Sequence, residues 1–516
     1  MKRIPVRKRK LRAGGKVAAS PLRASPVAQK SVTAILLHGR RGSLHRTIES
    51  LRQSDCVKEI VLLSPQEIDP PEGCSVLRAS SPDAMETIRA IAAAIRTRYV
   101  LFVTDTGSVD FVRGGLDRIA RAMDDSGAGL VYGDCHDGGD GIPVPHPLND
   151  YQLGSIRDDF DFGPAVMVDA SLLRQSMLEI GGEDYRHAGR YALRLSLSRH
   201  APLLHLPEFL SCREAPEARS SHERQFSYVD PLQGNAQKEM EHAATAHLRK
   251  IGALLDGPAS IVDLDEGTFP VHASIIIPVK NRRRVISDAV SSALRQLTPF
   301  SFNVIVVDNH STDGTEKFLD AFARRDARLI HVVPDRTDLG IGGCWNEGIA
   351  HPSCGRFVVQ LDSDDLYMDE TTLQKMVDVF YREKCAMAIG SYRMTNLQLR
   401  EIPPGIVDHR EWTADNGRNN ALRVNGFGAP RAFFTPIIRR MGFPNISYGE
   451  DYAVCLAISR HYHVARIFEP VYYCRRWEGN SDASPDDATR MARERDKDTL
   501  RTAEILIRQK LNGGEK

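Results

Sequence analysis

The chain has 516 residues, of which 42% are hydrophobic and 26% charged, and its formal net charge is +1. At about 150 residues per domain, this length predicts more than one domain. No stretch approaches the ~18 consecutive apolar residues of a membrane span, and no apolar signal-peptide core follows Met1. The nine cysteines show no CxxC spacing, which favours buried thiols in a reducing cytosol over disulfides or a zinc site.

Residues 1–30 form a basic tail without a single acidic residue, and they include Arg7-Lys8-Arg9-Lys10. We expect a disordered, soluble arm. The alternative is peripheral membrane association, because such an arm is attracted to anionic lipid. The tail has too few apolar residues for an amphipathic membrane helix, and no motif elsewhere supports nucleic acid as a partner.

Residues 31–215 are predicted to form a first α/β unit. Apolar strands at 32–37 and 60–63 are separated by a helical pattern. Strands that are apolar on both faces and alternate with helices predict a mostly parallel sheet covered by helices on both faces. Ligands of such sheets bind at the carboxyl ends of the strands.

A second unit repeats the first at an offset of about 260 residues. Residues 191–200 and 452–461 are both helical patterns that end in Ser-Arg-His. Four further pairs of segments precede these helices in the two units and occur in the same order: 51–53 with 294–296, 60–63 with 304–307, 98–101 with 356–359, and 162–163 with 427–428. The chain is therefore predicted to be a tandem of one fold, with the second copy at 269–485 and a C-terminal helix at 486–516.

Residues 216–268 are predicted to connect the two units through a helix at about 236–255. The helix has a continuous apolar stripe, which must be buried, so we expect a packed connector and not a free linker. Gly257-Pro258 ends the helix. The stripe consists of Met240, Ala243, Ala244, His247, Leu248, Ile251 and Leu255.

The run Asp362-Ser363-Asp364-Asp365 follows a short apolar strand at 356–361. Three carboxylates at a strand end repel one another and resist burial unless a cation compensates them. Mg²⁺ and Mn²⁺ prefer carboxylate oxygens and bridge phosphates. The run therefore predicts a metal–diphosphate site, with Asp364 and Asp362 as metal ligands. The alternative is a solvated turn that caps the following helix.

Two further segments precede this run. Asp308 ends the strand at 304–307, where a carboxylate suits a ribose or a base edge. Asp313 is predicted to cap the helix that follows, with Glu316 as its capping-box partner. The Gly-rich loop at 338–348 lets backbone N–H groups approach a phosphate or a sugar, and it is not a Walker loop.

Two segments follow the acidic run. Glu450 and Asp451 begin the Ser-Arg-His helix. They are either partners of the helix dipole or a general base for a reacting hydroxyl. Arg475 and Arg476 offer cations to a departing diphosphate, although a surface basic pair would have the same sequence.

In this order, the motifs between about 272 and 484 resemble those of the family-2 glycosyltransferases, which have the GT-A fold. Residues 275–281 are similar to the family's first strand and turn, and residues 308–315 to its nucleotide-contacting turn. Asp362-Ser363-Asp364-Asp365 resembles its metal motif. Glu450-Asp451 resembles the acidic pair that contains its catalytic base.

The resemblance implies two GT-A-like domains and a metal-dependent, inverting transfer from a nucleotide-diphosphate sugar to a hydroxyl of a carbohydrate or lipid-linked acceptor. Asp451 would be the base, beside Glu450, and Mn²⁺ or Mg²⁺ the cofactor. Polysaccharide or glycolipid assembly in the cytoplasm, at the inner membrane face, is the family's common setting. The implied nucleotide-sugar contacts are Pro278, Asn281, Asp308, Asn346, Asp362, Ser363, Arg475 and Arg476.

The chain departs from the family pattern at two places. Trp345 stands before Asn346, where the family commonly has Arg; it could stack on a sugar face or simply pack. The segment 475–480 lacks the family's frequent metal-assisting His, so Asn480 or a water would have to take that place.

The first unit resembles a degenerate copy that has lost the chemistry. Without gaps, Thr104-Asp105-Thr106 falls opposite Asp362-Ser363-Asp364, and Gly189-Arg190 falls opposite Glu450-Asp451. Ser64 stands where Asp308 would be expected. Since the strand end keeps its apolar residues and loses its acids, the scaffold does not need these carboxylates. This comparison favours the metal–diphosphate role over the capping turn.

Two other functions stay open from the sequence alone. A nucleotidyltransferase shares the α/β sheet and the Asp–metal chemistry, but it would need a basic Gly-rich signature near the first strand, for which only Lys280 and residues 282–284 give support. A non-catalytic sugar-nucleotide or carbohydrate-binding protein would bind donor without metal-dependent turnover.

Overall fold

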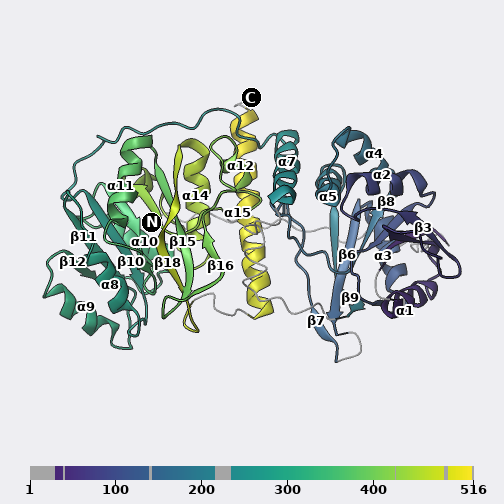
Figure 1. Cartoon of the computed structure of the whole chain (residues 1–516), viewed down its shortest axis with the longest axis horizontal. Helices are drawn as coiled ribbons and strands as arrows, with labels where there is room; N and C mark the ends of the chain where they lie inside the picture. Colours follow the sequence, from purple (N-terminus) through teal and green to yellow (C-terminus); the bar gives the residue numbers. More distant parts are fainter. Residues whose placement is uncertain are drawn as a thin grey trace, which may run out of the picture.

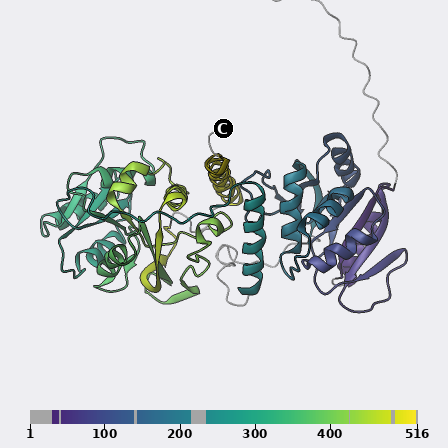
Figure 2. The same ribbon diagram turned by 90° about the horizontal axis from the view of Figure 1, so that it is seen from above.

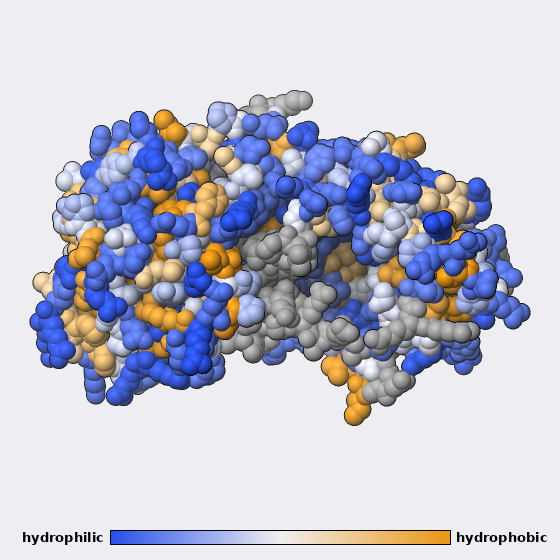
Figure 3. Space-filling model, viewed as in Figure 1, coloured by the Kyte–Doolittle hydropathy of each residue, from blue (hydrophilic) through white to orange (hydrophobic). Residues whose placement is uncertain are grey.

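The computed structural model describes residues 30–38, 41–138, 142–214, 234–424, 426–480 and 486–513. Two α/β domains lie side by side, with helices α7 and α15 between them (Figures 1 and 2). The face in Figure 3 is mostly hydrophilic, with small scattered apolar patches. No helix in the described ranges is long and apolar enough to cross a bilayer. The prediction for the basic tail lies outside the described residues.

The first domain is built on a nine-stranded sheet with the order β3-β2-β1-β4-β8-β6-β9-β5, and β7 pairs with β6. The strands are β1 (Val32–Leu37), β2 (Val57–Ser64), β3 (Cys74–Arg78), β4 (Tyr99–Val103), β5 (Val109–Phe111), β6 (Leu130–Asp137), β7 (Val144–His146), β8 (Ala165–Asp169) and β9 (Leu203–Arg213). The helices are α1 (Arg41–Arg52), α2 (Met85–Ala94), α3 (Gly115–Ser126), α4 (Ala170–Ile180), α5 (Gly189–His200) and α7 (Gly234–Lys250).

The second domain has a sheet with the order β12-β11-β10-β13-β17-β15-β18-β14, and β16 pairs with β15. Its strands are β10 (Ala273–Val279), β11 (Phe302–Asp308), β12 (Leu329–Val332), β13 (Phe357–Gln360), β14 (Leu366–Tyr367), β15 (Met387–Asn396), β16 (Glu401–Val407), β17 (Arg431–Phe434) and β18 (Val464–Arg476). Its helices are α8 (Ile286–Leu294), α9 (Thr315–Ala323), α10 (Ile341–Ala350), α11 (Thr372–Glu383), α12 (Gly417–Asn420), α13 (Thr435–Met441), α14 (Glu450–His461) and α15 (Asp487–Gly513).

The two sheets correspond strand for strand, which confirms the predicted repeat. The strands β3-β2-β1-β4 and β12-β11-β10-β13 pair in parallel, as their unbroken apolar sequences predict. The other half of each sheet is mixed, because β8 and β17 run antiparallel to their neighbours. Apolar periodicity shows that a strand is buried but not its direction, so this reversal was not visible in the sequence.

Helices α7 and α15 are equivalent members of the repeat. Each follows the last long strand of its unit and packs on that unit's preceding helix, α7 on α5 and α15 on α14. Helix α7 begins two residues before the predicted helix and ends five residues earlier. Ala243, Ala244, His247 and Leu248 of its predicted stripe are buried. The helix is thus packed on the first domain, and it also contacts α12 of the second domain.

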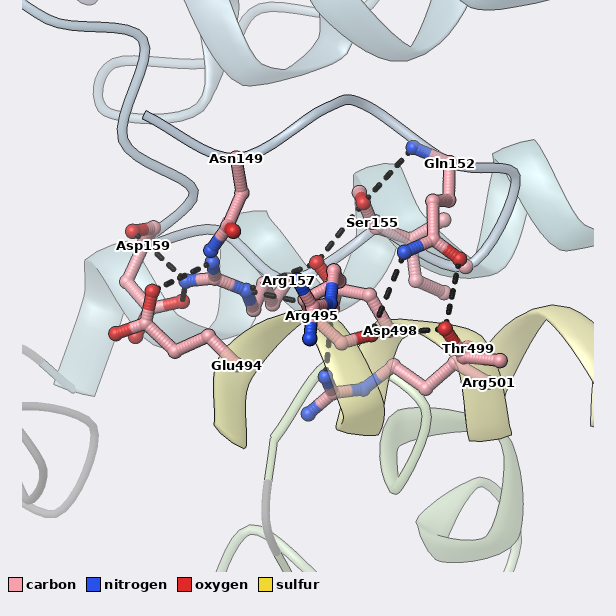
Figure 4. A network of polar contacts seen from close by, with 12 residues as sticks. Asn149, Gln152, Ser155, Arg157, Asp159, Glu494, Arg495, Asp498, Thr499 and Arg501 are labelled. Carbon is pink, nitrogen blue, oxygen red and sulfur yellow. Dashed lines mark hydrogen bonds and ion pairs between the residues drawn. The ribbon is translucent and has the colours of Figure 1, made fainter. Parts of the chain in front are cut away.

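Helix α15 also docks on the first domain through a polar network around Arg157 (Figure 4). The Arg157 guanidinium lies 3.4 Å from Asp498 and 3.2 Å from Glu494, both on α15. Ser155 Oγ donates to Asp498 Oδ2 at 2.9 Å. Since Arg157 and Asp498 are almost fully buried, removing either partner would strand a charge, at a cost of about 3–5 kcal/mol.

The first domain approaches α15 tightly at Gly154. A Cβ at this position would collide with the Asp498 carbonyl oxygen and the Thr502 nitrogen, so Gly154→Val should destabilise the docked pair by about 2 kcal/mol or more. Differential scanning calorimetry should show an earlier transition. The matched control is Gly182→Val, where no atom lies within 4 Å. Equal melting of both variants would contradict the docking described above.

Candidate functional site

A cleft of about 760 Å³ opens in the second domain, beside the carboxyl ends of β10 and β13. This is the edge of the sheet at which ligands of α/β folds bind. It also receives the start of α14 and two side chains of α15, Arg493 and Lys497. The predicted site residues that line it are Pro278, Asn281, Asp362, Ser363, Asp364, Glu450, Asp451 and Arg476.

The acidic run after β13 is held from several sides. Asp364 Oδ2 accepts hydrogen bonds from Trp477 Nε1 at 3.1 Å and from Asn480 Nδ2 at 3.0 Å. The Asp362 N–H donates to the Tyr472 hydroxyl at 3.0 Å. Asn480 therefore lies at the acidic run, in the segment where the usual His is missing.

The same run is electrostatically strained without a cation. Burial, followed by the charge of Asp364, raises the pKa of Asp362 to about 6. Burial and both neighbouring carboxylates raise the pKa of Asp365 well above its usual range. A divalent cation would relieve this repulsion, so the carboxylate donor set fits Mg²⁺ or Mn²⁺. Among the described residues no three His, Cys, Asp or Glu side chains are arranged so that they could hold a metal ion by themselves.

Glu450 and Asp451 form the first turn of α14, and Gly449 precedes them with a φ of 81°. Asp451 makes an ion pair with Arg431 at 2.5 Å and reaches the cleft. Glu450 is buried, and its Oε2 accepts no hydrogen bond within the described residues. Burial and the adjacent Asp451 charge hold the pKa of Glu450 far above its usual range, so Glu450 favours the neutral form, whereas Asp451 is paired with the Arg431 guanidinium.

Arg431 and Gln360 connect the two acidic centres. The Gln360 amide accepts from Arg431 at 3.0 Å and donates to Asp362 at 2.9 Å. The polar chain thus runs Asp451–Arg431–Gln360–Asp362 across the cleft. Neither Arg431 nor Gln360 was among the site residues predicted from the sequence. The available signal was a glutamine inside an otherwise apolar strand, with an arginine soon after the Phe427-Gly428 pair.

The first domain lacks all four residues of the polar chain that links Asp451 to Asp362. Val100 pairs with Val168 and Val358 pairs with Phe433 in equivalent strands, and α5 and α14 begin at Gly189 and Glu450. These registers support the gap-free alignment. The counterparts are Thr104 for Asp362, Phe102 for Gln360, Val166 for Arg431 and Arg190 for Asp451. Loss of the whole network together indicates that its members act as one unit.

Three predicted site residues lie outside the cleft lining. Asp308 is buried and accepts the Ser311 N–H at 2.9 Å, with His331 at 3.6 Å. The Asn346 side chain makes two hydrogen bonds to the backbone of Phe443. Arg475 approaches the acidic run from behind, where it donates to the Asp364 carbonyl and, at 2.9 Å, to Asp288. In this structure, these three side chains bond to neighbouring protein groups and do not line the cleft.

Gly340 and Gly342 of the Gly-rich loop have packing roles, while Ile341 and Cys344 of the same loop line the cleft. Side chains at Gly340 and Gly342 would collide with the backbone at Ile446 and Pro444. Their N–H groups donate to Asn445 and Ile446, so they do not point at a phosphate. Trp345 stacks on Phe443 with 5.4 Å between the ring centroids and is only 4% exposed. Its role is therefore mainly packing, at the wall of the cleft.

The neutral state of Glu450 gives a testable contrast. Folding raises the pKa of Glu450. The carboxyl group therefore favours the folded state when the pH is below its usual pKa, and it loses this advantage as the pH rises through the raised pKa. Glu450→Gln mimics the neutral form, so activity should change by less than about threefold, and the fall in stability between the usual carboxyl pKa and the raised pKa of about 8 should diminish. Thermal melts across this pH range and rate assays check this. A rate loss as large as that expected for Asp451→Asn would make Glu450 the base.

Comparison with known proteins shows what the second domain is similar to. Residues 274–443 match the model of the family described as "Glycosyl transferase family 2". The glycosyltransferase TuaG of Bacillus subtilis strain 168, whose name refers to teichuronic acid biosynthesis, is 35% identical over 121 residues, which are 23% of this chain and 46% of TuaG. The Escherichia coli protein "UDP-Glc:alpha-D-GlcNAc-diphosphoundecaprenol beta-1,3-glucosyltransferase WfgD" is 27% identical over 195 residues, 38% of this chain and 72% of WfgD.

Among solved structures, TarS 1–349 of S. aureus in complex with UDP-GlcNAc aligns with a TM-score of 0.35 and 21% identity, over 46% of this chain and 72% of that chain. The mannosyltransferase PcManGT of Pyrobaculum calidifontis, in complex with GDP-Man and Mn²⁺, aligns with a TM-score of 0.34 and 16% identity, over 52% and 83% of the two chains. The matched part covers less than half of TuaG.

Proposed function

We propose that this chain, whose residues 274–443 are a family-2 glycosyltransferase domain, transfers a sugar from a nucleotide-diphosphate sugar to a hydroxyl group with inversion. The observation that carries the proposal is the polar chain from Asp451 through Arg431 and Gln360 to Asp362, at one cleft. The repeat replaces all four residues together, although it keeps the same sheet. A scaffold role for these side chains would not explain that pattern.

In the proposed reaction Asp451 is the general base. Its carboxylate takes the proton of the acceptor hydroxyl, and the hydroxyl oxygen forms a bond to the anomeric carbon of the donor sugar. The bond from that carbon to the diphosphate oxygen breaks, and the nucleoside diphosphate leaves with the electron pair. Arg431, at 2.5 Å from Asp451, fixes the orientation of the carboxylate.

Asp362 and Asp364 would hold the metal ion, with Ser363 beside them, and Asn480 hydrogen-bonds to Asp364. A bound Mg²⁺ or Mn²⁺ supplies charge to stabilise the departing diphosphate. Pro278 and Asn281 line the same cleft and are proposed to contact the nucleotide. Asp308, Asn346 and Arg475 are proposed to act on the nucleotide sugar through the turns that they hold.

The acceptor is proposed to be a carbohydrate or a lipid-linked sugar. WfgD is named for transfer to a diphosphoundecaprenol-linked sugar, and TuaG for teichuronic acid biosynthesis. We extend this class of acceptor to the present chain. A cytoplasmic location at the inner membrane face, with the basic residues 1–30 near anionic lipid, follows from the same proposal. The first domain is proposed to be non-catalytic.

Product analysis tests the function. The purified chain is incubated with a panel of UDP-, GDP-, CDP- and dTDP-sugars and Mn²⁺, and released phosphates are separated by chromatography. Free nucleoside diphosphate is the expected product. Release of pyrophosphate from nucleoside triphosphate and sugar phosphate would instead establish a nucleotidyltransferase. Binding of a nucleotide sugar without any turnover would establish a binding protein.

A further inference from the structure

The N-terminal half of α15 presents two cations to the cleft. Arg493 and Lys497 both line it, and both are half-buried. They are four residues apart, so they lie one helical turn apart on the same face of the helix. Neither belongs to the family-matched segment at 274–443. They therefore join the cleft from outside the part of the chain that carries the acidic run.

Tyr448 fixes these cations close to the proposed base. The Arg493 guanidinium lies 4.7 Å from the centroid of the Tyr448 ring, and the Lys497 ammonium lies 5.0 Å from it. Tyr448 is three residues before Asp451, and Leu500 of α15 packs at the intervening Gly449. Helix α15 is thus in contact with the turn from which the base projects.

For Lys497, the contact with the Tyr448 ring compensates only a small part of the positive charge, because a cation gains little over an exposed aromatic face. Within the described residues, no carboxylate forms an ion pair with Lys497. By contrast, the arginines beside the acidic residues of the cleft lie next to a carboxylate. Arg431 is paired with Asp451, and Arg282 lies 4.0 Å from Asp364. The Lys497 ammonium is therefore available to an anion in the cleft.

The adjacent face of the same helix turns is held by the first domain. Glu494 and Asp498 each follow one of the two cations in the sequence, and both bind Arg157 (Figure 4). Asp498 also binds Arg501, which donates to the Tyr452 hydroxyl at 3.1 Å. These contacts hold the cations at a defined place, as a binding site requires.

We infer that Arg493 and Lys497 form an acceptor subsite that binds an anionic carbohydrate through its phosphate or carboxylate group. The inference rests on the proposed function, and it narrows the acceptor from any sugar to a negatively charged one. The donor diphosphate is expected at Asp362 and Asp364, whereas these cations lie at the turn that carries the base, where the acceptor hydroxyl must be bound. Charge-assisted hydrogen bonds from Arg and Lys suit both anionic groups.

Isothermal titration calorimetry on the full chain tests the subsite in EDTA and without nucleotide, so that metal-mediated phosphate binding at the acidic run is eliminated. The probes are α-D-glucose 1-phosphate, methyl α-D-glucuronide and neutral methyl α-D-glucoside. We expect one or both anions to bind, and the neutral glycoside to bind at least about tenfold more weakly. Whichever anion binds more tightly identifies the group that the subsite prefers.

Variants assign the binding to α15. Lys497→Ala and Arg493→Ala should each weaken binding of the preferred anion by about tenfold, and Arg495→Ala, an exposed cation on the same helix, should leave it unchanged. Equal binding of the neutral glycoside, no binding of either anion, or equal losses in all three variants would overturn the inference. Failure of the proposed function would appear separately, as absence of nucleoside diphosphate release by the wild-type chain.

Discussion

Replacing Asp451 by Asn should lower the rate of sugar transfer by about a thousandfold, because general-base catalysis contributes on the order of 10²–10⁴. The Asn amide keeps the size of the side chain and still accepts a hydrogen bond from Arg431, which lies at 2.5 Å from Asp451. It cannot take the proton of the acceptor hydroxyl. Rates are measured as nucleoside diphosphate release in the presence of the acceptor, at a temperature where the melting curve shows the variant folded.

Two controls make this result specific to the base. Donor binding should be within about threefold of the wild type, since the nucleotide contacts lie at the other end of the polar chain. Glu450→Gln changes the adjacent carboxylate on the same helix turn and should keep activity. Normal turnover by the Asp451→Asn protein would refute the assignment of the base.

Asp364→Asn should abolish transfer, and removal of divalent metal by EDTA should do the same in the wild type. A metal ion at a diphosphate contributes several kcal/mol of charge stabilisation, which corresponds to more than a hundredfold in rate. The Asn side chain can still accept hydrogen bonds from Trp477 and Asn480, so the fold should be spared. Addition of Mn²⁺ should restore the EDTA-treated wild type but not the variant.

The first domain provides the matched control for the metal. Asp105 lies in the turn equivalent to the acidic run, where it accepts the Gly107 N–H at 2.8 Å. Asp105→Asn should leave both metal dependence and turnover unchanged. Full activity of the wild type in EDTA would contradict a metal role for Asp364. Loss of metal dependence in the Asp105→Asn variant would show that the metal acts in the first domain and not in the second.

Much of the architecture could be predicted because the chain contains two copies of the same fold, whose sequences can be compared with each other. The apolar strands at 32–37 and 273–279 are buried on both faces, so their hydrophobic pattern is strong. The shared Ser-Arg-His helices begin at equivalent positions, which set the register of Arg190 against Asp451 without gaps. Local pattern and repeat therefore agreed on the fold and on the acidic centres.

The remaining parts depended on contacts that sequence spacing does not encode. Gln360 and Arg431 are about seventy residues apart and meet because β13 and β17 are neighbours. Asp308 and Asn346 stand where the resemblance predicts ligand contacts, yet each side chain is taken up by nearby backbone groups. The role of α15 was equally hidden, because its two faces have different partners only after both domains have packed.

Metal-dependent binding of a nucleoside diphosphate tests the central claim most directly. Calorimetric titration of the full chain with UDP and with GDP, each with Mn²⁺, should give one diphosphate site per chain for the preferred base, and Asp364→Asn should eliminate it. That result would place the chemistry in the second domain alone. Two sites per chain, or one site that survives Asp364→Asn, would contradict the division of this chain into a catalytic domain and its inactive repeat.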